Sequence, residues 1–207
     1  VDIGGESTRP GSKVVKSNIE WNRVKNILKE FSKKKFLSLD TRKSDIMENG
    51  IKQGVKIIND VSGLNYDKKS IHILKKYKTP FVLQHSLKNP DTMQDNPKYK
   101  NVLLDIYDFF HEKINFLRNF GISHNNIILD PGIGFGKNLK HNIIILKNIS
   151  IYHSLGFPIL LGISRKKFIK EISSNNDSVN RIGGTISSSI YAMLNGIQIL
   201  RVHDVNE

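Results

Sequence analysis

Short apolar runs along the chain repeatedly end at a polar side chain. Six complete runs have this form, namely FLSLD, VKIIND, TPFVLQH, NIILD, PILLGISRK and IQILRVHD, and Val1 and Asp2 resemble the end of a seventh. Parallel strands that are buried on both faces appear in a sequence as continuous runs of Ile, Val and Leu. In an α/β barrel the functional side chains gather where such strands end. The pattern therefore predicts a barrel and the edge that carries its site.

Helical patterns fill the intervals between these runs. The expected helices cover residues 17–35, 44–51, 68–77, 98–120, 141–154 and 179–195. Ser17 and Glu20 have the spacing of a capping box at the start of the first helix. Alternating strands and helices favour a TIM (β/α)8 barrel over an open sheet. Because 207 residues are few for a complete barrel, we expect one domain, residues 1–207, that forms an incomplete barrel.

Composition limits the classes of protein that the chain can represent. It has no cysteine, which excludes disulfides and thiolate metal sites. Its longest apolar stretches, such as 143–146 and 157–163, are far below the roughly 20 residues of a membrane span. The opening DIGGESTRPG has neither the basic leader nor the apolar core of a signal peptide. We therefore expect a soluble, cytoplasmic protein without a membrane partner.

The net charge of +13 raises the alternative of a nucleic-acid-binding protein, because clustered basic residues neutralise phosphates. The basic residues are scattered, however, and no aromatic residues alternate with them, so we expect no nucleic-acid partner. The arginines are more informative than the total charge. Four of the seven lie near a proposed strand end: Arg9, Arg42, Arg165 and Arg201. A planar bidentate donor at such places suits a phosphate or carboxylate ligand.

Two glycine-rich segments and one C-terminal motif are candidates for ligand binding. DPGIGFGK, residues 130–137, has glycines at alternate positions, which lets a backbone approach a ligand closely; it matches neither a dinucleotide fingerprint nor a Walker loop. DIGGESTRPG either contacts an anion or is an ordinary terminus. In RVHD, Arg201 and His203 share one face of the last strand and can converge on one ligand. His85 follows a strand end and stays unassigned.

Several of these motifs, taken in order, are similar to those of one enzyme family. DIGGESTRPG, LDTRK, IINDVSGL, the stretch 85–97, LDPGIGFGKN, LGISRK and LRVHDV resemble the dihydropteroate synthases of folate biosynthesis over essentially the whole chain. The resemblance implies a transferase that joins (7,8-dihydropterin-6-yl)methyl diphosphate to 4-aminobenzoate and releases diphosphate and 7,8-dihydropteroate. Two alternatives stay open: a methyltetrahydrofolate-dependent methyltransferase type of pterin-binding barrel, and a basic binding protein without catalysis.

The resemblance also implies roles for individual residues. The pterin is expected to bind Asp40, Asn59, Asp130 and Lys166, of which Asp40 and Lys166 are catalytic. The diphosphate is expected to bind Thr8, Arg201 and His203, and the 4-aminobenzoate to bind Thr8, Arg9, Pro10, Phe135 and Ser164. A carboxylate that faces two N–H groups suits the amino-pyrimidine edge of a pterin. A second carboxylate can stabilise the positive charge that develops when diphosphate leaves.

Three features depart from the family pattern. Gln84 and Ser86 flank His85 where family members commonly have Met, which implies a more polar wall of the pterin pocket. Arg42 stands where Ser is common, just past the expected catalytic face, so we expect substitutions there to be tolerated. A first strand whose Asn helps to hold magnesium, and a closing helix, are expected in the family but not found. We therefore expect a Mg²⁺ cofactor without ligands in this segment, a homodimer, and an internal segment of a longer chain.

Overall fold

Parallel strands follow one another in the order of the chain in this computed structural model, which describes residues 1–9, 11–87, 96–174 and 177–206. One sheet has the order β1 (Asp2–Gly4), β2 (Ser38–Asp40), β3 (Ile57–Asp60), β4 (Phe81–Gln84), β5 (Ile127–Asp130). A second sheet pairs β6 (Leu160–Leu161) with β7 (Ile199–Leu200). A bridge between Leu129 and Ile159 connects the two sheets. The seven strand ends expected from the sequence are thus confirmed.

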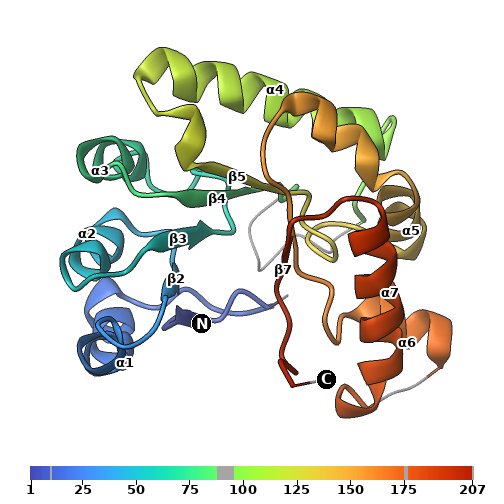
Figure 1. Cartoon of the computed structure of the whole chain (residues 1–207), viewed down its shortest axis with the longest axis horizontal. Coiled ribbons are helices and arrows are strands. Elements are labelled where there is room, and N and C mark those ends of the chain that lie inside the picture. Colours follow the sequence, from blue (N-terminus) through green and yellow to red (C-terminus); the bar gives the residue numbers. More distant parts are fainter. Residues whose placement is uncertain (10, 88–95, 175–176, 207) are drawn as a thin grey trace.

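Helices surround the outside of this curved sheet (Figure 1). They are α1 (Ser17–Phe31), α2 (Ser44–Lys52), α3 (Ser70–Tyr77), α4 (Val102–Phe120), α5 (Leu139–Lys147), α6 (Lys167–Ser173) and α7 (Ile182–Leu194). Short 3-10 helices cover η1 (His124–Asn126), η2 (Ile149–Leu155) and η3 (Val179–Arg181). Within the described ranges, no ladder pairs β1 with β7, so the barrel is open between them. None of the described helices is long and apolar enough to cross a membrane.

Three local features differ from those expected from the sequence. Helix α1 has Lys16 as its N-cap residue, without a side-chain capping bond. Glu20 does not complete a capping box, because its carboxylate is buried and accepts hydrogen bonds from Thr41 and Lys43 instead. Helix α6 was not expected, because its apolar residues continue the run that forms β6. The expected helix over 141–154 is divided at Asn148 into α5 and η2.

The alternation of side chains along the strands separates an outer from an inner face. Outer-face residues are fully buried against the helices: Leu39, Ile58, Phe81, Leu83 and Leu129. Inner-face residues form a smaller, separate apolar cluster: Ile57, Val82, Ile128, Leu160 and Ile199. The inner face becomes polar two residues further along β3, β4 and β5, at Asn59, Gln84 and Asp130. This change places the polar side chains at the carboxyl ends of the strands.

Candidate active site

Buried polar atoms without partners lie together on the inner face. The strand register pairs Asp40 with Asn59, and Gln84 with Asp130, on neighbouring strands. Asp40 Oδ1, Asn59 Oδ1 and both amide atoms of Gln84 are buried and have no hydrogen-bond partner. Folded proteins pair nearly all of their buried polar atoms. Several unpaired atoms at the ends of adjacent strands therefore indicate a place where a polar ligand binds.

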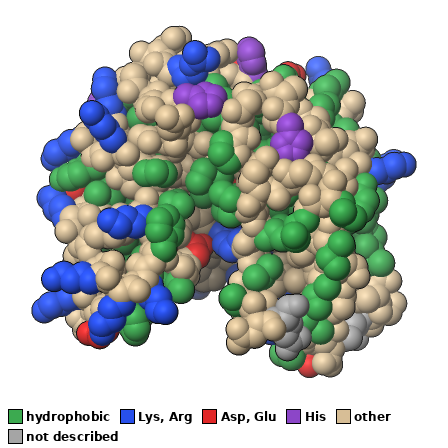
Figure 2. Space-filling model, viewed as in Figure 1, with side chains coloured by type: hydrophobic (Ala, Val, Ile, Leu, Met, Phe, Trp, Pro, Cys, Tyr) green, Lys and Arg blue, Asp and Glu red, His purple; other side chains and the backbone are tan. Residues whose placement is uncertain are grey.

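A cavity of about 680 Å³ opens beside Asp40 and Asn59, whereas Gln84 and Asp130 are not among the residues that line it. Figure 2 shows a hollow in the middle of this face, with acidic and basic side chains inside it. Residues lining the cavity include Asp40, Asn59, Ser164, Lys166, Arg201 and His203. They follow or end β2, β3, β6 and β7. The structure thus brings together six residues that the sequence analysis selected from four separate strand ends.

Asp2 connects the two sides of this cavity, although the sequence analysis gave it no role. Its Oδ2 accepts a hydrogen bond from Asn59 Nδ2 at 3.2 Å and another from Arg201 Nη1 at 3.1 Å. Burial raises the pKa of Asp40 well above its usual value, the charge of Asp2 raises it further, and the charge of Arg201 opposes them. The sequence did hold a sign of this role, because Asp2 ends the shortened first run as other site residues end theirs.

Asp130 ends β5 and begins the glycine-rich loop. Its Oδ1 accepts a hydrogen bond from Gly132 N at 2.8 Å, which fixes the carboxylate. Its negative charge raises the pKa of both Lys166 and Arg201 against the effect of their burial. Gly132, Gly134 and Gly136 have φ angles of 68°, 80° and 63°. A side chain is strained in that left-handed conformation, so the glycines allow the tight loop that the sequence predicted.

Replacing Gly132 with alanine is expected to lower the free energy of unfolding by about 3 kcal/mol. The added Cβ would lie 2.0 Å from the carbonyl oxygen of His85, and the backbone would keep its unfavourable φ. Gly156→Ala is the matched control, because Gly156 has a φ of 82° and open space around the new Cβ. The control should cost only about 1 kcal/mol. Chemical denaturation measures both changes, and equal losses would contradict the close approach to His85.

Lys166 lies between the cavity and the glycine-rich loop. Its Nζ donates a hydrogen bond to Ile133 O and lies 4.5 Å from the centre of the Phe135 ring. Burial lowers the pKa of Lys166 to about 7, although the charge of Asp130 acts in the opposite direction. Phe135 is itself buried and packs against Val61. A lysine that exchanges its proton near neutral pH therefore lies directly over an aromatic ring.

Arg201 and His203 line the same cavity but contact different partners. Arg201 binds Asp2, whereas His203 Nδ1 lies 2.9 Å from the Ser164 hydroxyl oxygen. Strand β7 ends at Leu200, so the expected strand alternation across RVHD is wrong. Both residues nevertheless line one cavity, and their binding of a common ligand stays a prediction.

The opening loop, residues 5–16, connects β1 with α1 and lies beside the cavity. None of its described residues lines the cavity. Thr8 is half-buried and Arg9 is exposed, and neither lines the cavity. The pKa of His203 is lowered by burial first and then by nearby arginines, including Arg9, so the charge of Arg9 reaches the same region. Pro10 lies outside the described residues. The charge of Arg9 thus acts on the predicted diphosphate residue His203, and Thr8 is not among the residues that line the cavity.

His85 and Lys137 form a buried pair that the sequence analysis missed. Lys137 Nζ lies 3.0 Å from His85 Nδ1 and donates a hydrogen bond to Phe135 O at 2.9 Å. Burial lowers the pKa of both groups well below their usual values, and the charge of Lys137 adds to the effect on His85. Lys137 therefore connects the glycine-rich loop to His85 and fixes the backbone at Phe135.

Arg42 does not occupy the tolerant position that the sequence suggested. It is only 4% exposed, and its Nε donates a hydrogen bond to Glu6 Oε1 at 2.8 Å. Its guanidinium carbon lies 4.2 Å from the centre of the Tyr66 ring. Removing one member of a buried ion pair leaves the other charge uncompensated, which is costly. The structure therefore contradicts the reason for expecting tolerance.

Comparisons with known proteins agree with this geometry. The family model described as pterin binding enzyme matches residues 1–203. A dihydropteroate synthase of Clostridium beijerinckii is 39% identical over 211 residues, which cover 100% of this chain and 75% of that protein. The dihydropteroate synthase of Escherichia coli K12 is 35% identical, with 100% of this chain and 73% of that protein covered. The chain belongs to the dihydropteroate synthase family.

Solved dihydropteroate synthases have the same fold. The Yersinia pestis dihydropteroate synthase, in a sulfonamide drug complex, matches with a TM-score of 0.95 at 35% identity, covering 99% of this chain and 74% of that one. The Xanthomonas albilineans dihydropteroate synthase with 4-aminobenzoic acid matches with a TM-score of 0.92 at 33% identity, covering 99% and 73%. The family resemblance and the TIM-barrel fold are confirmed, and the chain is a transferase of folate biosynthesis.

Proposed function

We propose that the site condenses (7,8-dihydropterin-6-yl)methyl diphosphate with 4-aminobenzoate, giving 7,8-dihydropteroate and diphosphate. The observation that carries the proposal is the group of unpaired buried atoms of Asp40, Asn59 and Gln84 beside Asp130. A pterin is a flat ring with donors and acceptors along its edges, and it can pair with these atoms. Unpaired buried polar atoms are costly, so their pairing favours the bound state.

In the proposed complex the Asp130 carboxylate accepts two hydrogen bonds from the amino-pyrimidine edge of the pterin. Asn59 Oδ1 accepts a further N–H, and Lys166 donates to a ring acceptor. Gln84 adds one donor and one acceptor from the neighbouring strand, where its amide atoms have no protein partner. Charge-assisted bidentate pairing of this kind is strong and selective for one edge of a ring.

Chemistry then proceeds at the methylene group of the pterin. The bond from this carbon to the diphosphate oxygen breaks, and the leaving group moves toward Arg201 and His203. Positive charge develops on the pterin beside Asp40, and a nearby positive charge lowers the pKa of a carboxylic acid, so Asp40 releases its proton to water and its carboxylate stabilises that charge. The amine of 4-aminobenzoate forms the new C–N bond and loses a proton. That proton passes to the released diphosphate, because Lys166 already carries its own proton when it donates to the pterin.

The second substrate is proposed to bind at the outer end of the same site. Phe135 provides an aromatic surface under the Lys166 ammonium, and Ser164 lies beside His203. Thr8, Arg9 and Pro10 would approach the 4-aminobenzoate carboxylate when the opening loop moves over the cavity. A guanidinium binds a carboxylate bidentately, which suits Arg9.

A magnesium ion that accompanies the diphosphate stays a prediction. The residues described in the structure include no group of three or more His, Cys, Asp or Glu side chains that could hold a metal ion. The carboxylate of Asp2, which contacts the predicted diphosphate residue Arg201, is engaged by Asn59 and Arg201. These side chains do not fit a magnesium cage, and each step above is assigned to protein groups alone.

Two further properties are proposed, namely action in the cytoplasm and assembly as a homodimer. The lack of cysteine suits a reducing compartment. Exposed apolar side chains on α7 support the homodimer: Ile186, Ile190, Met193 and Leu194. Hydrophobic side chains gather over the α7 side of the face shown in Figure 2. Light scattering should give twice the mass of the chain, and Met193→Glu should return the value to that of a monomer.

The affinity for a pterin is expected to fall as the pH rises above about 7. Lys166 has a pKa of about 7 when the site is free, and a bound acceptor favours its protonated form. Binding above pH 7 must therefore take up a proton, which weakens the affinity by up to about tenfold per pH unit. Titrations between pH 6 and 9 measure the effect.

Lys166→Met should remove this pH dependence, so the affinity of the variant should stay nearly constant between pH 6 and 9. Lys167→Met is the matched control, because the Lys167 side chain is exposed and pairs with Glu171 on α6. The control should keep the wild-type profile. A wild-type profile that matches that of Lys166→Met would exclude the proposed donor.

Product formation tests the proposed reaction. The protein is mixed with pterin diphosphate, 4-aminobenzoate and Mg²⁺, and 7,8-dihydropteroate is measured by mass spectrometry. The product should appear only when both substrates are present, together with one diphosphate per product. Absence of product, combined with pterin binding that is equal in wild type and Asp130→Ala, would overturn the proposal.

A further inference from the structure

The base of the opening loop contains a buried cluster of charges that the proposed reaction does not use. The Glu6 cluster consists of Glu6, Glu20, Thr41, Arg42 and Lys43. Each member is less than 9% exposed, at 7%, 1%, 3%, 4% and 6% respectively. Buried charges are costly unless they are paired and hydrogen-bonded. A cluster of five buried polar residues next to the end of β2, which carries Asp40, therefore requires an explanation.

Glu6 joins both ends of the opening loop to the end of β2. Its Oε2 accepts hydrogen bonds from Val15 N at 2.8 Å and from Lys43 Nζ at 2.7 Å. Its Oε1 accepts from Arg42 Nε at 2.8 Å. Burial raises the pKa of Glu6, but the hydrogen bonds from Lys43, Val15 and Arg42 outweigh it and lower the pKa overall. One ionised carboxylate thus connects the start of the loop, its end and the segment after Asp40.

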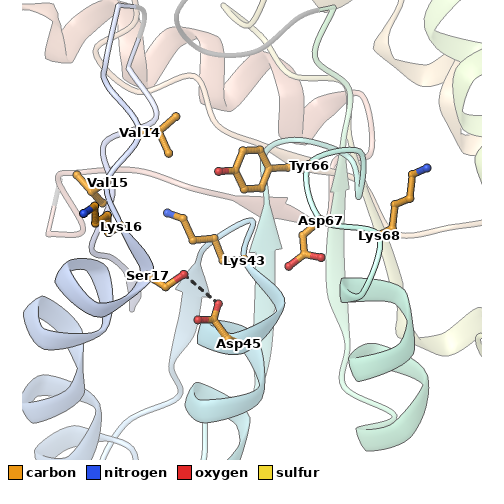
Figure 3. A pocket seen from close by; sticks show the side chains of 9 residues that line it. All are labelled: Val14, Val15, Lys16, Ser17, Lys43, Asp45, Tyr66, Asp67 and Lys68. Atoms are coloured by element: carbon orange, nitrogen blue, oxygen red, sulfur yellow. Dashed lines mark hydrogen bonds between the residues drawn. The ribbon is translucent and has the colours of Figure 1, made fainter.

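The neighbouring residues hold this carboxylate in one place. Lys43 also donates to Glu20 on α1, and these two carboxylates raise its pKa against the effect of burial. Gly5 packs so closely on α1 that an added Cβ would lie 2.6 Å from Glu20 O. Figure 3 shows Lys43 and Tyr66 facing the segment around Val15. The base of the loop is therefore rigid.

Residues between the two fixed ends are held less firmly. Ser7, Arg9, Gly11, Lys13 and Val14 are exposed. Within this stretch Ser12 donates from its hydroxyl to Ser7 O at 2.6 Å and from its backbone to Arg9 O at 3.0 Å. The described residues of this exposed part are thus bonded to one another and make few bonds to the base that Glu6 fixes. Its position relative to the cavity depends on that base.

We propose that Glu6 is a positioning residue for the second substrate, which places the exposed part of the opening loop over the cavity. This inference rests on the proposed function, because it assigns the loop to 4-aminobenzoate. Misplacing a binding group by about 1 Å can cost up to a hundredfold in rate. The Glu6 cluster reaches the pterin residues through Thr41, which follows Asp40 and donates a backbone hydrogen bond to Asn59 O at 3.1 Å. The Glu6 carboxylate itself is bonded to Val15, Arg42 and Lys43. Loss of the carboxylate should therefore affect the two substrates unequally.

Glu6→Gln tests the proposal. The variant keeps the shape of the side chain, but its amide N–H group faces the N–H donors of Val15, Arg42 and Lys43. The KM for 4-aminobenzoate should rise by about tenfold, while the Kd for a pterin should stay within about twofold of wild type. Trypsin cleavage after the exposed Lys13 should become about tenfold faster. Glu48→Gln is the matched control, because Glu48 also pairs with two lysines but lies on α2. The control should change none of the three values.

Arg42→Met provides a second variant if Glu6→Gln does not fold, because it removes one donor and leaves Lys43 in place. It should likewise raise the KM for 4-aminobenzoate and speed trypsin cleavage after Lys13. Equal increases in KM for 4-aminobenzoate and in Kd for the pterin, or no change in cleavage after Lys13, would overturn the role of Glu6. If the wild type makes no product, the proposed function fails, and the cleavage rate alone still decides whether Glu6 fixes the loop.

Discussion

Asp130→Ala is expected to weaken pterin binding by about a hundredfold or more, because it removes two charge-assisted hydrogen bonds. The carboxylate is 1% exposed and is held by Gly132 N, so it is already in place before the ligand arrives. The loss should appear in the Kd for a pterin without diphosphate as well as in the KM for the diphosphate substrate. Isothermal titration measures the first and initial rates measure the second.

Asp130→Asn separates binding from loop structure. The amide oxygen can still accept the hydrogen bond from Gly132 N, whereas the amide nitrogen faces the donors of the pterin. Binding should fall nearly as far as in Asp130→Ala, with a smaller loss of stability. Asp105→Asn is the control, because Asp105 accepts a similar backbone bond from Lys100 N on the outside of the molecule. A pterin Kd within threefold of wild type for both Asp130 variants would remove Asp130 from the site.

Arg201→Met is expected to weaken binding of the pterin diphosphate by about a hundredfold, because a guanidinium pairs bidentately with phosphate oxygens. Asp130, Asp2 and Asp40 raise the pKa of Arg201 against its burial, so it stays charged. The affinity for a pterin without diphosphate should change by less than about threefold. Competition titrations with the two ligands measure this difference.

The role of Asp2 follows from the same experiment. Asp2 holds Arg201 Nη1 in the free site, so Asp2→Asn should weaken diphosphate binding less than Arg201→Met does. Arg118→Met serves as the control, because Arg118 is exposed on the last turn of α4. Equal losses for the two pterin ligands in Arg201→Met would show that Arg201 supports the pocket as a whole and does not bind the diphosphate.

The strand ends could be predicted because each buried strand is a continuous apolar run that stops at a polar residue. Leu39, Ile58 and Leu83 face the helices, whereas Asn59 and Gln84 face inward. That alternation is local and visible in the sequence. Asp130 ends such a run and Lys166 follows another, but their assignment to the pterin came from the family resemblance.

Other features depend on contacts between distant parts of the chain. Glu20 fits a capping box by spacing, but its partner is Lys43, 23 residues further along. Asp2 pairs with Arg201, which is 199 residues away. Arg42 was expected to be tolerant because it lies just past the catalytic face, and the sequence does not show its contacts with Glu6 and Tyr66. Pairing of this kind requires the fold, and spacing along the chain cannot reveal it.

A crystal structure of the protein with a bound pterin tests the central claim most directly. The account predicts that the ring lies inside the open barrel, with its amino-pyrimidine edge within hydrogen-bond distance of Asp130 and Asn59. The amide of Gln84, which has no partner in the free site, should bond to the same ring. A pterin bound outside the barrel, or one inside it that leaves Asp130 and Asn59 without contact, would contradict the account.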